Sequence, residues 1–429
     1  MMRTGLAIEL LLCGFGLSAC GSDAIGPAHT GGAGASGLAG ANGEAGSSAG
    51  VAGAGTLGAA GAAGGNLGLA GQGASAGAGA GGAGSAGQAG SSAGQANGGA
   101  GPIGPRFIGR FDLSQPDAPT FAWPGTAIAL RFTGTAIGVT LTDKGSDKGN
   151  NVFEVVLDGK HTVLPLQTGT KKYALGSGLT AGAHELLLYR RTEPVFNETT
   201  FNGFDVPSSA YLPASMPTRR LEVIGDSISA GYGNEGVNPC TFTAATENHY
   251  LTYGALAARA VNAELYTEAW SGIGMLRNYE GTTTGIMPER YPRALPDRAT
   301  SSWDFGKFVP DAVVINLGSN DFAKGDPGAA FQAAYLKFVT ELRGHYPAAR
   351  FFLGVGPMFG SDEFAKASTY LKAVIAARAS AGDKNLTLLD LGTQDGTADG
   401  LGCDYHPSLK THQKMADKLQ AALKADLGW

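Results

Sequence analysis

The fold of this chain is decided by the segment Leu221-Glu222-Val223-Ile224-Gly225-Asp226-Ser227-Ile228-Ser229-Ala230-Gly231-Tyr232-Gly233. It begins with a short apolar run that predicts a buried strand, and Gly225 ends that run. Ser227 follows the strand, and an α/β sheet exposes reactive groups at the carboxyl ends of its strands. Ser227 is therefore a candidate nucleophile, although a Gly-Asp-Ser tripeptide alone is more typical of an ordinary turn.

Three later stretches, which follow in a set order, strengthen this interpretation. Trp270-Ser271-Gly272-Ile273-Gly274 comes after a strand-like run, Gly318-Ser319-Asn320-Asp321 after a second, and Asp404-Tyr405-His406-Pro407 near the C-terminus. Serine, glycine, asparagine and histidine blocks in this order resemble those of the SGNH (GDSL-type) hydrolases. The resemblance implies a serine hydrolase, and four ordered blocks are far more specific than any one of them.

Residues 217–429 alternate between strand-like and helix-like stretches. Strands are predicted at 221–224, 263–269, 312–317, 350–353 and 386–391, and helices near 249–261, 328–344, 363–380 and 408–426. In the last helix, apolar residues recur at spacings of three and four, which predicts one buried stripe that includes His412. Alternating strands and helices predict an α/β fold with a parallel sheet and helices on both faces.

Residues 105–213 show the period-two alternation of strands with one buried face. Ile128, Leu130 and Phe132 alternate with other residue types, and Asp158-Gly159 between two apolar runs predicts a tight hairpin. Several short strands with turn signals predict an all-β sandwich or jelly roll. The acidic loop 143–147 has the oxygen ligands for calcium, but its lysines favour a plain turn.

The two regions together resemble carbohydrate esterase family 2, in which a jelly-roll domain is joined directly to an SGNH hydrolase domain. The matching residues are Arg110-Phe111-Asp112, Phe121-Ala122-Trp123-Pro124-Gly125-Thr126, Asp158-Gly159, Asn202-Gly203-Phe204 and the run from Gly225 to Asn234. The resemblance covers everything from residue 106 to residue 429. It implies an esterase that removes O-acetyl groups from plant polysaccharides such as xylan or glucomannan.

The front of the chain predicts export. Residues 1–20 resemble a bacterial lipoprotein signal, in which Leu17-Ser18-Ala19-Cys20 is the lipobox and Cys20 the lipidated residue; an ordinary cleaved signal is the alternative. Residues 21–104, mostly glycine, alanine and serine, have no apolar period, so we expect a flexible tether that holds the enzyme at a cell surface or outer membrane. The net charge of −5 offers no basic excess for nucleic acid.

Ester hydrolysis by a serine needs a base, a group that orients the base, and donors to the oxyanion. Of the seven histidines, only His406 lies on a loop after the last predicted strand, so it is the candidate base for Ser227. Asp404 lies two residues earlier, and in an extended segment its carboxylate would face the imidazole and fix its tautomer. The resemblance implies that some members work as Ser–His dyads, so a backbone carbonyl remains the alternative orienting group.

The remaining site residues come from the glycine and asparagine blocks. Gly272 is expected to offer a backbone N–H, and Asn320 a side-chain amide, to the oxyanion; Gly274 and Asn316 are their respective rivals. Candidate platforms for stacking sugars are Tyr405, Trp270 and Phe359, with core packing as the alternative for Trp270 and Tyr405. The sequence has no zinc-type Cys/His cluster and no full dinucleotide fingerprint, so we predict an enzyme without a metal or cofactor.

The cysteines predict a disulfide bond. Outside the predicted signal and the lipidated Cys20, the chain contains only Cys240 and Cys403, and an exported protein meets an oxidising compartment. Cys240 follows the Ser227 segment and Cys403 precedes His406, so a Ser–His pair would bring them together. Two hypotheses compete with the acetyl esterase: a lipase or thioesterase on the same fold, and a carbohydrate-binding lipoprotein with a decayed hydrolase domain.

Overall fold

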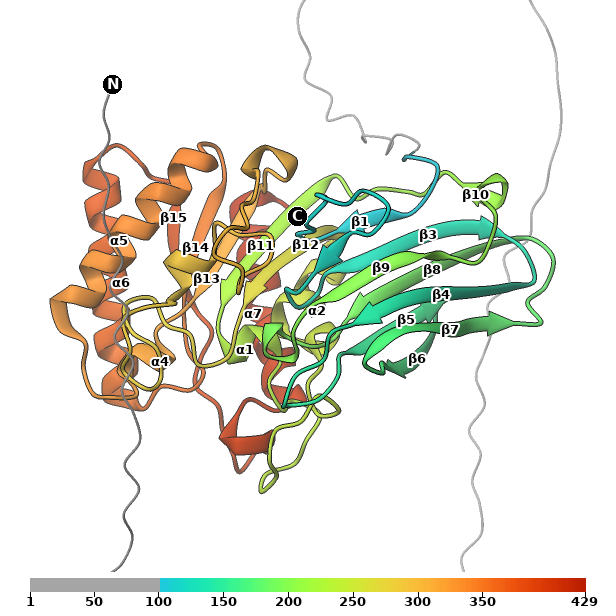
Figure 1. Cartoon of the computed structure of the whole chain (residues 1–429). Helices are drawn as coiled ribbons and strands as arrows, with labels where there is room; N and C mark the ends of the chain where they lie inside the picture. The colour runs from blue at the N-terminus through green and yellow to red at the C-terminus, as the bar shows by residue number, and fades with distance from the viewer. Residues whose placement is uncertain (1–100) are drawn as a thin grey trace, which may run out of the picture. The chain divides into compact units, whose positions relative to one another are not determined.

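The computed structural model describes residues 101–429, so the predicted signal, Cys20 and most of the tether lie outside the described residues. The described residues begin with a β-rich domain of two antiparallel sheets (Figure 1). One sheet has the order β1-β3-β8-β5-β6 with β10 also beside β3, and the other has the order β2-β9-β4-β7. The strands are β1 (Arg106–Ile108), β2 (Thr120–Phe121), β3 (Ala127–Thr133), β4 (Ala136–Asp143), β5 (Val152–Leu157), β6 (Lys160–Pro165), β7 (Gly169–Ser177), β8 (Ala183–Arg190), β9 (Thr199–Phe204) and β10 (Tyr211–Leu212).

One apolar core is shared by the two sheets of this domain. Ile128 and Phe132 of β3 are buried in it, as are Ile137 and Leu141 of β4 on the other sheet. These residues alternate along their strands, which confirms the pattern that the sequence predicts. The predicted hairpin is also present, since Asp158 and Gly159 join β5 to β6 and both have positive φ, as a two-residue turn of this kind requires.

The second domain is built on a five-stranded parallel sheet with the order β12-β11-β13-β14-β15. The strands are β11 (Arg219–Gly225), β12 (Ala263–Ala269), β13 (Ala312–Asn316), β14 (Arg350–Val355) and β15 (Leu386–Asp390). All five coincide with predicted strands to within a few residues. The strand that carries Ser227 at its end is β11, which has a neighbour on each side, so the residues following β12 and β13 can lie next to Ser227.

Helices cover both faces of this sheet (Figure 1). The long helices are α2 (Tyr253–Ala260) and α7 (Leu409–Leu427), which pack on one face, and α5 (Gly328–His345) and α6 (Ser361–Ser380), which pack on the other. The short ones are α1 (Ser227–Ala230), α3 (Met287–Arg290), α4 (Ser319–Phe322), η1 (Pro194–Phe196), η2 (Ser208–Ala210), η3 (His249–Leu251), η4 (Phe305–Lys307) and η5 (Cys403–Tyr405). His412 lies buried on the apolar stripe of α7, as predicted.

The predicted helix at 249–261 is interrupted, which corrects the prediction at that point. His249 begins a single 3₁₀ turn, and Thr252 then stands in an extended conformation and accepts a hydrogen bond from the Ala255 N–H as the cap of α2. A threonine at this position satisfies a free N–H of the helix, so the chain starts a new helix there. His249 is therefore not part of the helix on which the sequence places it.

A buried ion cluster joins the two domains at strands β11 and β12 of the parallel sheet. Arg110 of the β-rich domain is fully buried and pairs with Glu222 of β11 at 2.9 Å and Glu268 of β12 at 2.8 Å. Its guanidinium also lies 4.3 Å from the centre of the Tyr291 ring. A buried charge costs much free energy unless it is paired, so Arg110 and its two partners hold the domains in one arrangement.

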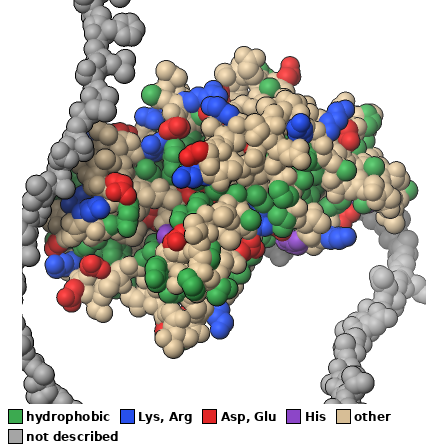
Figure 2. Space-filling model, turned by 60° about the horizontal axis from the view of Figure 1, so that its bottom comes forward, with side chains coloured by type: hydrophobic (Ala, Val, Ile, Leu, Met, Phe, Trp, Pro, Cys, Tyr) green, Lys and Arg blue, Asp and Glu red, His purple; other side chains and the backbone are tan. Residues whose placement is uncertain are grey.

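The described residues contain no helix that is both long and apolar enough to span a membrane. Acidic, basic and apolar side chains are interspersed over the face shown in Figure 2.

Candidate active site

Ser227 lies at the point where β11 turns sharply into α1. Asp226 caps this helix by accepting a hydrogen bond from the Ile228 N–H at 3.0 Å. A side chain at Gly225 is impossible without rearrangement, since an added Cβ would lie 2.1 Å from the Ser229 Oγ. The glycine thus permits the tight turn that places Ser227 beyond the end of the strand, at the edge predicted for it.

His406 contacts Ser227 directly. Its Nε2 lies 2.9 Å from the Ser227 Oγ, and its Nδ1 lies 3.1 Å from the backbone carbonyl oxygen of Asp404. Because a carbonyl only accepts hydrogen bonds, Nδ1 carries the proton and Nε2 is left to accept from the serine hydroxyl. Burial lowers the pKa of His406 to about 4, so the imidazole is neutral near pH 7.

The Asp404 carboxylate is not where the extended-segment prediction places it. Cys403–Tyr405 form a 3₁₀ turn, and Asp404 itself has φ 50° and ψ 41°. Its carboxylate accepts hydrogen bonds from the Tyr232 hydroxyl at 2.8 Å and the Phe242 N–H at 3.1 Å. The group that orients His406 is therefore the Asp404 carbonyl, and the carboxylate instead ties its turn to the segment after Ser227.

The expected disulfide between Cys240 and Cys403 is present. It is flanked by two backbone hydrogen bonds, from the Cys403 N–H to the Gly233 carbonyl at 3.0 Å and from the Asp404 N–H to the Cys240 carbonyl at 3.2 Å. The Tyr232 ring, whose position sequence reasoning missed, stacks on His406 with ring centres 4.1 Å apart. The serine and histidine loops are thus joined by covalent, polar and stacking contacts.

Gly272 and Asn320 line the same cavity as Ser227 and His406, a space of about 690 Å³. Gly272 has φ 77°, and an added Cβ there would meet no atom within 4 Å, so the space beside its α-carbon is open. The Asn320 Nδ2 donates to the Ile273 carbonyl at 2.9 Å and makes a longer contact of 3.4 Å to the Asp226 Oδ2. Both expected oxyanion donors therefore lie around the serine.

Their two rivals lie elsewhere. The Gly274 N–H already donates to the Asn278 Oδ1 at 3.1 Å, and an added Cβ at Gly274 would lie 1.9 Å from the Arg277 carbonyl oxygen. Asn316 is buried within β13 and does not line the cavity. The geometry thus favours Gly272 and Asn320 as the donors.

Asp321 and Asp226 hold the two donor loops against the serine turn. The Asp321 carboxylate accepts from three successive N–H groups of the glycine block, those of Met275, Leu276 and Arg277. The Ser319 Oγ donates to the Asp226 Oδ2 at 2.6 Å, and burial raises the pKa of Asp226 to about 6. These contacts support the view that Asp226 orders the loop and takes no direct part in chemistry.

The three expected aromatic platforms are placed differently from one another. Phe359 is mostly buried and lines a smaller space of about 270 Å³ that shares Ser227 and His406 with the larger one. Tyr405 is 66% exposed but lines neither space. Trp270 lies under the Arg290 guanidinium, 4.0 Å from the ring, and lines a separate cavity. Of the three, only Phe359 lines a space that also contains Ser227 and His406.

Tyr279 is a second aromatic residue that sequence reasoning missed. It lines both spaces next to Ser227 and is 54% exposed. It lies in an irregular loop without periodicity, and no signal in the sequence distinguishes it from other loop tyrosines.

Among the described residues, no three His, Cys, Asp or Glu side chains are grouped as metal ligands would be.

Comparisons with known proteins agree with this architecture. Residues 107–215 match the model for the carbohydrate esterase 2 N-terminal domain, and residues 223–414 match the GDSL-like lipase/acylhydrolase family. A cellulase/esterase of Acetivibrio thermocellus is 41% identical over 75% of this chain. The matched region spans only 39% of that protein's length. An acetylxylan esterase/glucomannan deacetylase of Cellvibrio japonicus is 28% identical, over 76% of this chain and 91% of its own length.

The structural comparison covers the same region. The structure of a family two carbohydrate esterase from Clostridium thermocellum, in complex with cellohexaose, is 40% identical with a TM-score of 0.72. This match covers 76% of the present chain and 100% of that one. Two adjoining domain matches and a fully covered homologue show that the chain belongs to carbohydrate esterase family 2.

Proposed function

We propose that this protein is a carbohydrate O-acetyl esterase that acts on acetylated plant polysaccharides of the xylan or glucomannan type. The observation that supports it best is the 2.9 Å contact between the Ser227 Oγ and the His406 Nε2 at an open cavity lined by Gly272 and Asn320. The Cellvibrio japonicus relative is an acetylxylan esterase/glucomannan deacetylase, which supports this substrate class.

In the first half of the reaction, the His406 Nε2 takes the proton of Ser227 as the serine oxygen attacks the acetyl carbonyl carbon. The carbonyl oxygen becomes an oxyanion, and the Gly272 N–H and the Asn320 amide, which turns from its long contact with Asp226, stabilise its charge. When the tetrahedral intermediate collapses, the bond to the sugar oxygen breaks and His406 returns its proton to that oxygen. The sugar leaves with a free hydroxyl, and Ser227 carries the acetyl group.

In the second half, His406 removes a proton from a water molecule, which attacks the acetyl-serine. Collapse of the second tetrahedral intermediate releases acetate and restores the serine hydroxyl. The Asp404 carbonyl keeps the proton of His406 on Nδ1 throughout, so the same imidazole nitrogen serves as base and acid in both halves. The catalytic unit in this proposal is a Ser–His dyad that is oriented by a backbone carbonyl.

The lining of the cavity fits a sugar better than a long acyl chain. Besides the catalytic groups, it includes Lys148, Glu280 and Asp404, together with the rings of Tyr232 and Tyr279. Charged groups beside aromatic rings suit a polar ring with hydroxyls, whereas a lipase site needs an extended apolar pocket. The same lining favours the acetyl esterase over the competing lipase or thioesterase.

The test is to measure acetate release from acetylated xylan, acetylated glucomannan and an aryl acetate, with an aryl palmitate as the comparison. We expect turnover of the three acetates, little on the palmitate, and loss of nearly all activity in Ser227→Ala. Preference for the palmitate would contradict the proposal, as would sugar binding by a protein that turns over no ester.

We also propose that the enzyme is exported and held at the cell surface through a lipid on Cys20, with residues 21–104 as a flexible tether. This part of the proposal depends on the lipobox and on the glycine-rich composition. Cys20→Ala should move the protein from the membrane fraction to the soluble fraction of the producing cell. An unchanged distribution would contradict the anchor without affecting the esterase proposal.

A further inference from the structure

The segment that follows β8 carries a fully buried carboxylate from the β-rich domain to the active-site edge of the other domain. The Oε2 of Glu193 accepts a hydrogen bond from the Ser271 N–H at 2.6 Å, and its Oε1 accepts one from the Ser271 Oγ at 2.5 Å. Ser271 directly precedes Gly272, the glycine with an open backbone beside Ser227. A residue of the β-rich domain thus forms two hydrogen bonds with the residue next to an expected oxyanion donor.

A carboxyl group suits this contact best. Ser271 presents two donors side by side, and an ionised carboxylate is the side chain that offers two acceptor oxygens at once. A glutamine would place an N–H₂ group against one of these donors, although the serine hydroxyl can turn and accept from it. Glutamine therefore preserves part of the contact, whereas alanine removes all of it and leaves the Ser271 N–H without its acceptor.

Glu193 is itself fixed by its neighbours. The Arg190 Nη2 donates to the Glu193 carbonyl at 3.0 Å, and the Glu193 N–H donates to the Glu247 Oε2 at 3.2 Å. Burial raises the pKa of Glu193 to about 7, so the fold keeps this carboxyl at an unfavourable place for a charge. A buried carboxyl of this kind is retained where its hydrogen bonds fix the position of a neighbouring residue, which here is Ser271.

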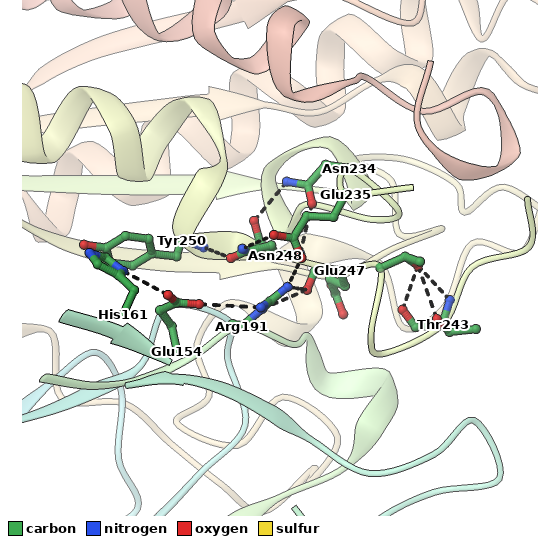
Figure 3. Close-up of polar contacts among 10 residues, drawn as sticks. Glu154, His161, Arg191, Asn234, Glu235, Thr243, Glu247, Asn248 and Tyr250 are labelled. Carbon is green, nitrogen blue, oxygen red and sulfur yellow. Dashed lines mark hydrogen bonds and ion pairs between the residues drawn. The ribbon is translucent and has the colours of Figure 1, made fainter. Parts of the chain in front are cut away.

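The next residue along the segment reaches the loop that follows Ser227. Figure 3 shows the Arg191 side chain between Glu154 of the β-rich domain and Glu235 and Glu247 of the hydrolase domain. Glu235 also accepts a hydrogen bond from the Asn248 Nδ2 at 2.9 Å. Residues 190–193 therefore contact both loops that meet at the active site, with Glu193 on the glycine block and Arg191 on the serine loop.

We infer that Glu193 is a positioning residue, through which the β-rich domain sets the Gly272 peptide of the oxyanion site by holding Ser271. The inference depends on the proposed esterase function, because it assigns Gly272 a role in that reaction. It also gives the β-rich domain a part in catalysis, distinct from binding polysaccharide.

The test uses an aryl acetate, so that contacts with a sugar do not enter the result. Removing an oxyanion donor outright costs about 10²- to 10³-fold in kcat, and displacing one should cost less, so we expect Glu193→Ala to lower kcat about 10- to 100-fold. KM should change by less than about threefold, because the acetyl group is bound weakly before the transition state. Glu193→Gln should recover much of the loss.

Two further variants separate positioning from a general loosening of the domains. Glu264→Gln breaks another contact between the domains, that of Glu264 with Arg106, at the opposite end of β12, and it should leave kcat unchanged. Glu193→Ala with Ser271→Ala should be no slower than Glu193→Ala alone, because the single change already removes the contact. If Glu193→Ala does not fold, Glu193→Gln and Ser271→Ala carry the test, each with a smaller expected loss of kcat.

Wild-type kcat in folded Glu193→Ala would overturn the inference, as would an equal loss in Glu264→Gln. Amide hydrogen exchange of residues 270–274 gives a readout that does not need activity, and Glu193→Ala should speed it. If the wild-type protein hydrolyses no acetate ester, the proposed function fails. Unchanged exchange in Glu193→Ala would then separately show that Glu193 does not hold the glycine block.

Discussion

His184 and His406 are two histidines, one in each domain, whose pKa values the fold shifts in opposite directions. His184 has an acceptor on each ring nitrogen, the Asp158 Oδ2 at 2.6 Å and the Thr180 carbonyl at 2.8 Å. These hydrogen bonds, that with Asp158 first, raise the pKa of His184. His406 has one acceptor, the Asp404 carbonyl, and burial lowers its pKa to about 4.

The difference shows what a histidine needs to act as a base. With an acceptor on each ring nitrogen, the doubly protonated imidazole of His184 is stabilised, and no lone pair faces a reacting group. With one acceptor and one hydroxyl partner, the neutral tautomer is favoured and the Nε2 lone pair faces the serine. In the proposed mechanism the base is the histidine without a contacting carboxylate, and five predictions test this contrast.

The largest effect separates the two histidines by function. His406→Ala should lower kcat by about 10⁴-fold or more on an aryl acetate, and Ser227→Ala with His406→Ala should be little worse, because the pair acts as a unit. His184→Ala should leave kcat unchanged while lowering the melting temperature. Comparable activity in His406→Ala and wild type, checked by initial rates, would remove His406 from the mechanism.

The second prediction concerns pH. His406 acts as a base only when neutral, so activity should be present above its pKa and fall as pH drops through about 4. A histidine with an ordinary pKa of about 6.5 would have lost nearly all of its basic form at pH 4.5. The acid limb of kcat/KM, measured on an aryl acetate, checks this; a midpoint near 6.5 would show that His406 is not desolvated as described.

Rates on the acid limb must be measured in short assays, because the stability of the folded protein also depends on pH. Burial lowers the pKa values of His249 and His412 to about 3, below the ordinary value, so the unfolded chain binds more protons than the folded one. Stability from these two groups is complete above about pH 6.5 and decreases as pH falls towards their folded pKa values. Rates taken soon after a pH jump separate this effect from the titration of His406.

The third prediction concerns the disulfide bond. No carboxylate contacts His406, so we expect the disulfide to restrain the turn that carries it. The Cys240–Cys403 disulfide fixes the turn that bears His406, so Cys240→Ser with Cys403→Ser should lower kcat about tenfold through misplacement of the imidazole. The chain-entropy model gives about 5 kcal/mol as the upper limit of the accompanying loss of stability. Thiol labelling of the unfolded, unreduced wild-type protein should find neither cysteine free. Two free thiols would contradict the disulfide.

The fourth prediction is that the Asp404 carboxylate matters little for turnover. A triad carboxylate is worth about 10⁴-fold in kcat, but this one contacts Tyr232 and Phe242 instead of His406. Asp404→Asn should therefore slow the reaction by less than about tenfold, since an asparagine oxygen still accepts from the Phe242 N–H. A loss of several thousandfold would mean that the carboxylate orients the imidazole during the reaction.

The smallest effect concerns the other histidine. Because the folded-state pKa of His184 is raised, its contribution to stability is complete below about pH 6.5 and is lost as pH rises through the raised pKa. Asp158→Asn should thus lower the melting temperature more at pH 5.5 than at pH 9, with kcat unchanged. Equal losses at both pH values, by calorimetry, would show that His184 is uncharged.

The sequence predicts the sheet and its catalytic edge well because both follow from local patterns. β11, β13, β14 and β15 each contain an apolar run, β12 is a mixed stretch, and the serine, glycine and asparagine blocks come after β11, β12 and β13. The orientation of Asp404 is different. A positive φ at an aspartate depends on contacts with Gly233 and Cys240, which lie far away in the chain, and no periodicity encodes that.

Glu193 shows the same limit more strongly. It lies 78 residues before Ser271 and in another domain, within a stretch that reads as an ordinary strand end. Its burial and its partner depend on how two domains pack, and packing across a junction leaves no pattern in either segment. Residue types near a strand end are thus readable from sequence, while the contacts that align them are not.

The buried Arg110 has a consequence for inheritance and engineering. Glu222 and Glu268 are both fully buried in the hydrolase domain, and the cation that pairs with both of them belongs to the domain before it. Residues 217–429 transplanted onto another protein would keep both acids and lose their counter-charge. Recombination between the two coding regions would be tolerated only if the arginine and its two acids travelled together, so the pair of domains behaves as one gene-level module.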